Sequence, residues 1–420
     1  MIDLNNKVFN LKDYVTKADM IRALMASTIA FTACFAVWTI FSIIGIRIKY
    51  EIGLSDTQFG LLVATPILTG SLTRLFLGIW TDQYGGRIVF TLLMLLASMC
   101  TWSLTFADDY YQCIIAALGI GLSGGGFAVG IAYVSRWYPK EQQGTALGIF
   151  GMGNFGAAIT NFGAPFLIYL GWQGVAKIYS ATLFMVAILF FFFTKTDPII
   201  TYRRKFKIKF DSASKQLEPL KNLQVWRFSL YYFFVFGAFV ALALWLPRYY
   251  IGVYGLDIKT AGILTSMYSL PGSVFRALGG VLSDKIGARR VMSWTFNFSA
   301  ICLFLMSYPA TSYIIQGVSG DISFSLRVTL IPFVILTVIL GFFMSLGKAA
   351  VYKHIPVYYP NHVGSVGGIV GLIGGLGGFC CPIIFGILND VIGVWTSCFM
   401  FLFLIVLVSL IWMNLAIKKM

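Results

Sequence analysis

Long apolar stretches alternate along the chain with short polar intervals. A helix needs about 20 mostly apolar residues to cross a bilayer, and twelve stretches of that kind can be drawn. Lipid offers no water to pair with backbone groups, so each stretch is predicted to be an α-helix. The sequence therefore predicts an all-α integral membrane protein with twelve transmembrane helices, at 20–46, 58–80, 88–106, 110–135, 143–170, 174–194, 223–251, 260–283, 290–308, 327–355, 362–388 and 391–417.

The segment 195–222 is the only long polar interval, and it separates six predicted helices from six. This division predicts two six-helix bundles joined by a linker. The predicted units are an N-terminal segment, a first bundle, a cytoplasmic linker, a second bundle and a short tail, at 1–19, 20–194, 195–222, 223–417 and 418–420.

One string occurs once in each predicted bundle, with a constant displacement of 202 residues (272 − 70). Its first copy is Gly70-Ser71-x-x-Arg74-x-x-x-Gly78-x-x-x-Asp82-x-x-Gly85-x-Arg87, and its second is Gly272-Ser273-x-x-Arg276-x-x-x-Gly280-x-x-x-Asp284-x-x-Gly287-x-Arg289. Each copy places one arginine inside an apolar stretch. A second repeat relates the glycines at 144, 148 and 151 to those at 364, 368 and 371, displaced by 220 (364 − 144). Two parallel repeats predict a pseudo-symmetric transporter in which one bundle rocks against the other.

Composition and charge support a membrane location. The chain is 58% hydrophobic and 11% charged, whereas soluble proteins carry about a quarter charged residues. A net charge of +15 could indicate a nucleic-acid-binding protein, but 22 of the 31 Lys and Arg lie in the N-terminus, the even-numbered loops and the C-terminus. That bias predicts cytoplasmic termini in a multi-pass cytoplasmic-membrane protein, with no nucleic-acid partner. The basic run at 203–209 is interpreted as a topology anchor facing anionic headgroups of the bilayer.

The loop motif G-x-x-x-D-x-x-G-x-R resembles that of the major facilitator superfamily. It stands at Gly78–Arg87 and again at Gly280–Arg289, after the second and eighth predicted helices. The resemblance implies the major facilitator fold. Asp82, Arg87, Asp284 and Arg289 are then candidates for a cytoplasmic gate, in which the carboxylate pairs across helix ends and locks one conformation. A local turn held by Asp and Gly is the alternative.

Two predicted helices are rich in glycine at three- and four-residue spacing, which in membranes lets backbones approach closely or slide. These candidate conformational glycines are Gly148, Gly151, Gly153, Gly156, Gly371, Gly374, Gly375, Gly377 and Gly378. Together with Asn154 and the paired arginines, these runs resemble the nitrate/nitrite porter family of the superfamily. The resemblance implies transport of nitrate, nitrite or both, with substrate-binding positions at Arg74, Arg276, Asn154, Tyr232, Phe236 and Phe127.

These side chains suit a small planar anion. A guanidinium is planar and offers paired N–H donors, so nitrate can meet it edge to edge. Aromatic faces at Phe127, Tyr232 and Phe236 would sandwich the anion, and the Asn154 amide would donate a further hydrogen bond. Charges inside a membrane usually mark a transport pathway, although an arginine can also cap helix carbonyls. Oxalate, formate and similar carboxylates match the same arginine pair, so transport of another small anion is the alternative function.

Energy coupling is predicted from an absence in the sequence. None of the 16 Asp and Glu falls in the middle of a predicted helix, so a carboxylate proton relay is not expected. Lys348 is the third charge at membrane depth, and it aligns with Phe127 at an offset of 221 (348 − 127). We therefore predict a substrate-binding and proton-coupling lysine. A permanently charged anchor and a lysine that snorkels to the interface are the alternatives. Nitrate/nitrite exchange needs no proton carrier.

Other protein classes are less consistent with the sequence. No nucleophile–base constellation, metal-ligand spacing or nucleotide-binding loop is present, so neither an enzyme nor a cofactor is expected. A membrane sensor or channel is the remaining class, and the double repeat favours alternating access over both. A monomer is expected because each chain carries both halves of the carrier.

Overall fold

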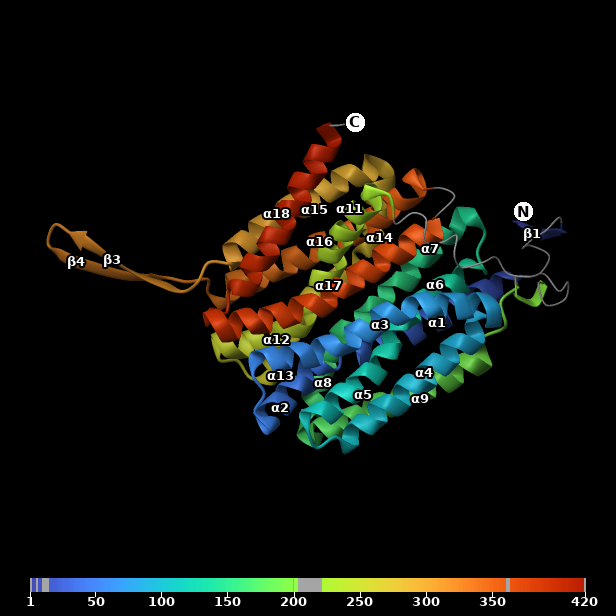
Figure 1. Cartoon of the computed structure of the whole chain (residues 1–420), viewed down its shortest axis with the longest axis horizontal. Helices are drawn as coiled ribbons and strands as arrows, with labels where there is room; N and C mark the ends of the chain where they lie inside the picture. The colour runs from blue at the N-terminus through green and yellow to red at the C-terminus, as the bar shows by residue number, and fades with distance from the viewer. Residues whose placement is uncertain are drawn as a thin grey trace.

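The computed structural model describes residues 2–4, 7–9, 15–198, 200–202, 221–359 and 363–418. Each of the twelve predicted transmembrane segments coincides with helix in these residues. The helices run side by side through one elongated bundle (Figure 1). We call the helices of residues 17–193 the first half and those of residues 223–418 the second half.

Several predicted helices of the first half consist of two helices in series. Short 3-10 segments at Gly121–Gly125 and Met152–Phe155 interrupt the fourth and fifth, where glycines are frequent. The helices of this half are α1 (Lys17–Trp38), α2 (Phe41–Ile52), α3 (Asp56–Tyr84), α4 (Gly86–Ser103), α5 (Tyr110–Ile120), α6 (Gly126–Ser135), α7 (Lys140–Gly151), α8 (Gly156–Leu167) and α9 (Gly171–Phe193).

The second half has breaks in other predicted helices. A π-helical segment η7 (Phe233–Ala238) interrupts the seventh predicted helix, and a second one, η8 (Ser283–Gly287), follows the eighth. The helices of this half are α11 (Leu223–Tyr232), α12 (Phe239–Tyr254), α13 (Ile258–Val274), α14 (Arg276–Leu282), α15 (Ala288–Met306), α16 (Leu330–Tyr358), α17 (Val363–Ile392) and α18 (Ser397–Lys418).

Length and apolarity alone identify eight membrane spans in the described residues, one of which, Thr145–Phe193, runs through α7, α8 and α9. Three helical segments do not meet this test of length and apolarity: α3, the α13–α14 pair and α15. They carry many Gly, Ser and Thr as well as the charges of the repeated string. Because α3 and α13 pack mainly against other helices, they need less apolar surface than a helix facing lipid.

The two ends of the bundle differ. An antiparallel hairpin of β3 (Thr311–Gly317) and β4 (Gly320–Leu326) projects from one end, and both chain termini lie at the other (Figure 1). A two-stranded pair, β1 (Ile2–Leu4) with β2 (Lys7–Phe9), lies near the N-terminus. We call these the hairpin end and the terminal end. The sequence analysis left residues 309–326 unassigned, because period-2 alternation over seven-residue strands is a weak signal beside membrane helices.

The two halves meet along α3 with α17 and along α8 with α13. Glycine permits these contacts. A Cβ added at Gly60 would lie 2.4 Å from the carbonyl oxygen of Pro382, and one at Gly262 would lie 2.2 Å from that of Asn161. A buried hydrogen-bond node joins the halves nearby, since Asn161 Nδ2 donates to the Ala243 carbonyl at 3.2 Å and its Oδ1 accepts from Ser42 at 2.8 Å. The halves are therefore in backbone contact toward the hairpin end.

The start of the predicted linker is part of the first half's fold. Asp197 is fully buried, accepts from the backbone N–H groups of Gly86 (3.2 Å) and Ile200 (3.0 Å), and pairs with Arg136 at 3.4 Å. It thereby caps the first turn of α4, where a negative charge is favourable. The basic run at 203–209 lies outside the described residues.

Replacing Asp197 with alanine is expected to lower the free energy of unfolding by about 3 kcal/mol, because it removes the buried acceptor of two backbone N–H groups and the carboxylate that pairs with the partly buried Arg136. Thermal unfolding of the detergent-purified variant measures this change. Asp108→Ala is the matched control, since that carboxylate is exposed at the opposite end of α4. Equal melting temperatures for Asp197→Ala and the wild type would contradict the capping role.

Candidate functional site

Arg74 lies in the middle of α3 and is buried, with 8% of its surface exposed. Its Nη1 donates to the Gly371 carbonyl of α17 at 3.2 Å, and its Nε lies 3.4 Å from the Gly124 carbonyl. The first contact crosses from the first half to the second. Arg74 is therefore fixed at the interface between the halves, as predicted for a residue of the transport pathway.

Arg276 is the first residue of α14, directly after the break that ends α13 at Val274. Its guanidinium carbon would lie 3.6 Å from a Cβ added at Gly151, so it faces the glycine-rich part of the first half. Its Nη1 is buried and has no hydrogen-bond partner. Each repeated arginine thus reaches toward the glycine-rich helix of the other half.

Aromatic rings surround both guanidiniums. Both guanidiniums lie over the Phe127 ring, whose centroid is 5.4 Å from Cζ of Arg74 and 5.6 Å from Cζ of Arg276. Phe236 lies 5.5 Å from Arg74, and Tyr352 lies 5.8 Å from Arg276. Each arginine therefore has at least two aromatic neighbours, and Phe127 is common to both. Such rings favour a cation over their faces and limit access of water to it.

The site holds positive charge without a matching carboxylate. Among the described residues, neither Arg74 nor Arg276 forms an ion pair. Both amide atoms of Asn154 and the hydroxyl of Tyr232 are buried and have no hydrogen-bond partner. Buried polar groups are nearly always satisfied, so this group of unpaired polar atoms indicates a site for a polar ligand. The chemistry of the donors favours an anion.

The glycines of α17 give room to the side chains of the site. A Cβ at Gly374 would lie 2.2 Å from Cδ1 of Tyr232, and one at Gly375 would lie 2.1 Å from Oγ of Ser71. A Cβ at Gly371 would lie 2.9 Å from the Tyr352 hydroxyl, while Gly377 and Gly378 meet Phe233, Ile67 and Val240. The glycine spacing in this helix thus has a direct packing cause.

The glycines near Asn154 have a different set of neighbours. Cβ atoms at Gly153 and Gly156 would meet α1, at 2.4 Å from Cδ1 of Phe31 and 2.2 Å from the carbonyl oxygen of Thr32. A Cβ at Gly148 would meet nothing within 4 Å. Close packing of α1 on the 3-10 segment Met152–Phe155 therefore sets the position of Asn154.

Lys348 is fully buried in α16, one helical turn before Tyr352. Its Nζ donates to the Gly272 carbonyl at 2.9 Å and lies 3.0 Å from the Phe239 ring centroid. Gly272 lies one turn before Arg276, at the break between α13 and α14. The lysine thus contacts the backbone that carries Arg276, and among the described residues no carboxylate pairs with it.

The predicted gate residues lie at the terminal end. Arg87 donates from Nε to the Phe191 carbonyl at 2.9 Å and stacks over the Phe191 ring at 4.3 Å. Asp284 pairs with Lys353 of α16, within the second half. Arg289 is exposed in α15, and the side chain of Asp82 lies outside the described residues. The contacts of Arg87 with Phe191 and of Asp284 with Lys353 each lie within one half.

Three further residues of the site were missed in the sequence analysis. Tyr352 follows Lys348 by four residues, so helical spacing alone would have placed it on the same face. Ser71 belongs to the repeated string. Trp38, 5.6 Å from Cζ of Arg74, donates from its indole N–H to the Pro66 carbonyl at 2.7 Å, and no pattern in the sequence distinguishes it from the other aromatics.

Comparisons with known proteins identify the family. The profile of the Major Facilitator Superfamily matches residues 26–331 and 254–418. The chain is 41% identical to a probable nitrate/nitrite antiporter, NarK1, of Thermus thermophilus, over 96% of this chain and 93% of the relative. It is 30% identical to a nitrite extrusion protein of Bacillus subtilis (strain 168), over 93% of each.

A solved bacterial homolog of the human lysosomal transporter Spinster, in an inward-facing and occupied conformation, superimposes with a TM-score of 0.74. That alignment covers 96% of this chain and 98% of the other, and its 16% identity supports the fold alone. The sequence matches and the fold agree. The chain belongs to the major facilitator superfamily, within its family of nitrate and nitrite transporters, and is a membrane transporter rather than an enzyme.

Proposed function

We propose that the protein moves nitrate or nitrite across the cytoplasmic membrane by alternating access, with the anion held between Arg74 and Arg276. The observation that carries this proposal is the pair of arginines, one from each half, in a shared aromatic enclosure with no carboxylate partner among the described residues. A monovalent planar oxyanion would neutralise part of this charge and accept from both guanidiniums. The relatives named for nitrate and nitrite support this class of substrate.

The basic loops support a cytoplasmic location for the terminal end, so the hairpin end would face outward. Four glycines on α3, α7, α14 and α17 lie on the terminal side of the arginines: Gly78, Gly148, Gly280 and Gly368. A Cβ at any of them would meet nothing within 4 Å, in contrast to Gly60 and Gly262 near the hairpin end. We infer that the helix surfaces at these four glycines come together when the transporter closes toward the cytoplasm, while the hairpin end opens.

Replacing Gly368 with leucine tests this closure. The added side chain meets open space in the described conformation, so nitrate binding should stay within about twofold, whereas overpacking of the closed state should slow transport about tenfold or more. Binding by titration calorimetry and flux in proteoliposomes separate the two effects. Gly163→Leu, in α8 toward the hairpin end and also with open space around it, is the control. Equal flux for wild type and Gly368→Leu would contradict the proposal.

Proton coupling is proposed to depend on Lys348. Its amine has only a backbone carbonyl and an aromatic face as near partners, so arrival of an anion beside Arg276 would favour the protonated form electrostatically. Return to the empty state would favour release of that proton. Exchange of nitrate for nitrite, the activity named for the Thermus relative, would not need this step.

Lys348→Gln is expected to abolish inward acidification during nitrate uptake while nitrate/nitrite exchange continues at a reduced rate. Proteoliposomes containing a pH dye, with and without internal nitrite, measure both modes. Lys259→Gln is the control, because that lysine lies near the hairpin end of α13. Unchanged acidification in Lys348→Gln would exclude the lysine as the proton carrier. Competition by formate and oxalate in the same vesicles tests the alternative substrates.

A further inference from the structure

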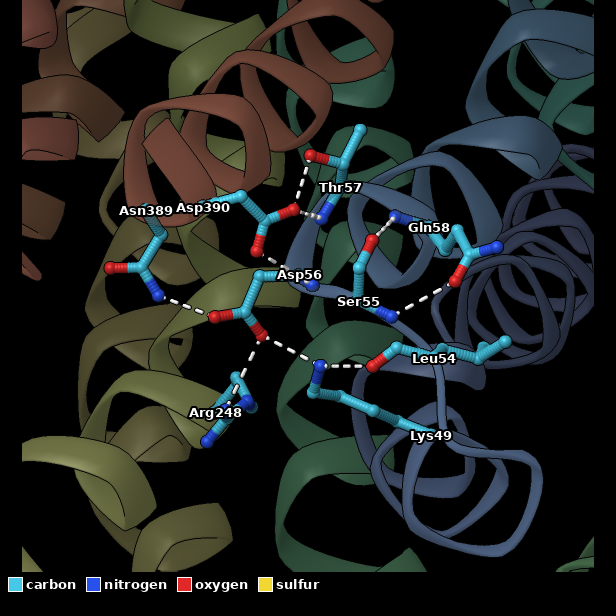
Figure 2. Close-up of polar contacts among 9 residues, drawn as sticks. All are labelled: Lys49, Leu54, Ser55, Asp56, Thr57, Gln58, Arg248, Asn389 and Asp390. Atoms are coloured by element: carbon cyan, nitrogen blue, oxygen red, sulfur yellow. Dashed lines mark hydrogen bonds and ion pairs between the residues drawn. The ribbon is translucent and has the colours of Figure 1, made fainter. Parts of the chain in front are cut away.

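A second cluster of charges lies at the hairpin end, well separated along α3 from Arg74. Its centre is the carboxylate of Asp56, the first residue of α3 (Figure 2). Oδ1 of Asp56 contacts Nζ of Lys49 at 2.9 Å and Nη2 of Arg248 at 3.3 Å, and Oδ2 accepts from Nδ2 of Asn389. Two cations and an amide thus contact this one carboxylate.

This cluster joins the two halves. Asp56 and Lys49 belong to the first half, whereas Arg248 in α12 and Asn389 in α17 belong to the second. Asp390 makes the reciprocal contact, accepting from the backbone N–H groups of Asp56 at 3.1 Å and Thr57 at 2.7 Å (Figure 2). Opening of the hairpin end must break the bonds from Asp56 to Arg248 and Asn389, and those from Asp390 to α3.

The partners that Asp56 would leave behind form an anion-binding surface. Cζ of Arg248 lies 4.7 Å from the ring centroid of Trp395, and its Nε is buried without a hydrogen-bond partner. Trp395 is itself fixed against Gly252, where a Cβ would lie 2.3 Å from its ring. Arginine, amide and aromatic face are also the groups of the central site, which combines Arg74, Asn154 and Phe127. Both places therefore fit a small planar oxyanion, and here the protein's own carboxylate occupies the position.

We propose that Arg248, Asn389 and Trp395 form an outer oxyanion site, which Asp56 fills when the hairpin end is closed and which the transported anion fills when that end opens. This inference rests on the proposed transport of nitrate or nitrite. An anion that binds only after Asp56 has left stabilises the open state, because a ligand shifts an equilibrium toward the state to which it binds more tightly. The outer anion thus both enters the pathway here and favours its opening.

Two variants distinguish this site from a simple latch. Both Arg248→Gln and Asp390→Asn weaken the contact between the halves, but only Arg248→Gln removes a donor to the outer anion. Loss of one charge-assisted hydrogen bond should raise the KM for nitrate offered at the hairpin end about tenfold. Asp390→Asn should not raise that KM, because the outer site stays intact. Arg248→Lys, which keeps the charge but not the paired donors, should recover only part of the loss.

Right-side-out and everted membrane vesicles offer nitrate at the hairpin end and the terminal end respectively. The outer site is supported if Arg248→Gln raises KM only in right-side-out vesicles while Asp390→Asn does not. Parallel changes in both variants, or an equal rise in both vesicle types, would overturn it, as would an unchanged KM in Arg248→Gln. Absence of nitrate flux in the wild type would instead overturn the proposed function, and this inference with it. Thermal unfolding of each variant confirms that it is folded.

Discussion

Glutamine in place of Arg74 or Arg276 is expected to lower the kcat/KM for nitrate uptake about a hundredfold. Each replacement removes charge-assisted hydrogen bonds worth about 3 kcal/mol together. It also leaves the other arginine as the single cation in the enclosure. Lysine should recover only part of the activity, because a point charge cannot meet a planar oxyanion with two parallel donors.

Initial rates of nitrate uptake in proteoliposomes, normalised to the amount of inserted protein, give this comparison. Arg47→Gln is the matched control, because that arginine lies exposed in α2 near the hairpin end. If the rate of nitrate uptake by Arg276→Gln stays within about twofold of wild type, one arginine is enough for the site. That result would contradict the proposed clamp of two arginines.

Gly374→Ala should have an effect nearly as large, although no polar group is lost. The new methyl would lie 2.2 Å from Cδ1 of Tyr232, whose ring is fully buried and stacked on Phe236 at 5.1 Å with an 8° interplanar angle. The stacked pair cannot move freely, because Phe236 already lies against Arg74. Overpacking of this kind typically destabilises by about 1–3 kcal/mol, so we expect nitrate affinity to fall about tenfold or more.

Calorimetric titration with nitrate checks this result, and thermal unfolding reports how much of the change is global. Gly163→Ala is the control, because its added methyl would meet nothing within 4 Å in another membrane helix. If Gly374→Ala binds nitrate as tightly as Gly163→Ala does, the position of Tyr232 does not depend on the absence of a side chain at Gly374.

The fold was predictable because lipid imposes a simple rule. Apolar length and loop charge predicted the helices, and the repeat of Arg74 at Arg276 predicted two related halves. The structure places both arginines over the ring of Phe127. Repetition was informative here because a buried arginine is costly and is seldom kept twice without a use.

The remaining features depend on contacts between segments far apart in the chain. Tyr352 could have been found from its helical spacing to Lys348, but Trp38 could not, since one tryptophan in a membrane helix resembles any other. The Asp56 cluster joins α2, α3, α12 and α17, so no local pattern in the sequence predicts it. The hairpin of β3 and β4 was missed because strand alternation over seven residues is faint beside helices of 20 or more.

The contact of the Phe127 ring with both guanidiniums has a consequence for stoichiometry. In the proposed transport cycle the two arginines share one anion, as they share this aromatic wall. A cycle that carries nitrate one way and nitrite the other then moves one negative charge in each direction. Such an exchange transfers no net charge, so its rate should not respond to membrane voltage, whereas nitrate entering with two protons would respond.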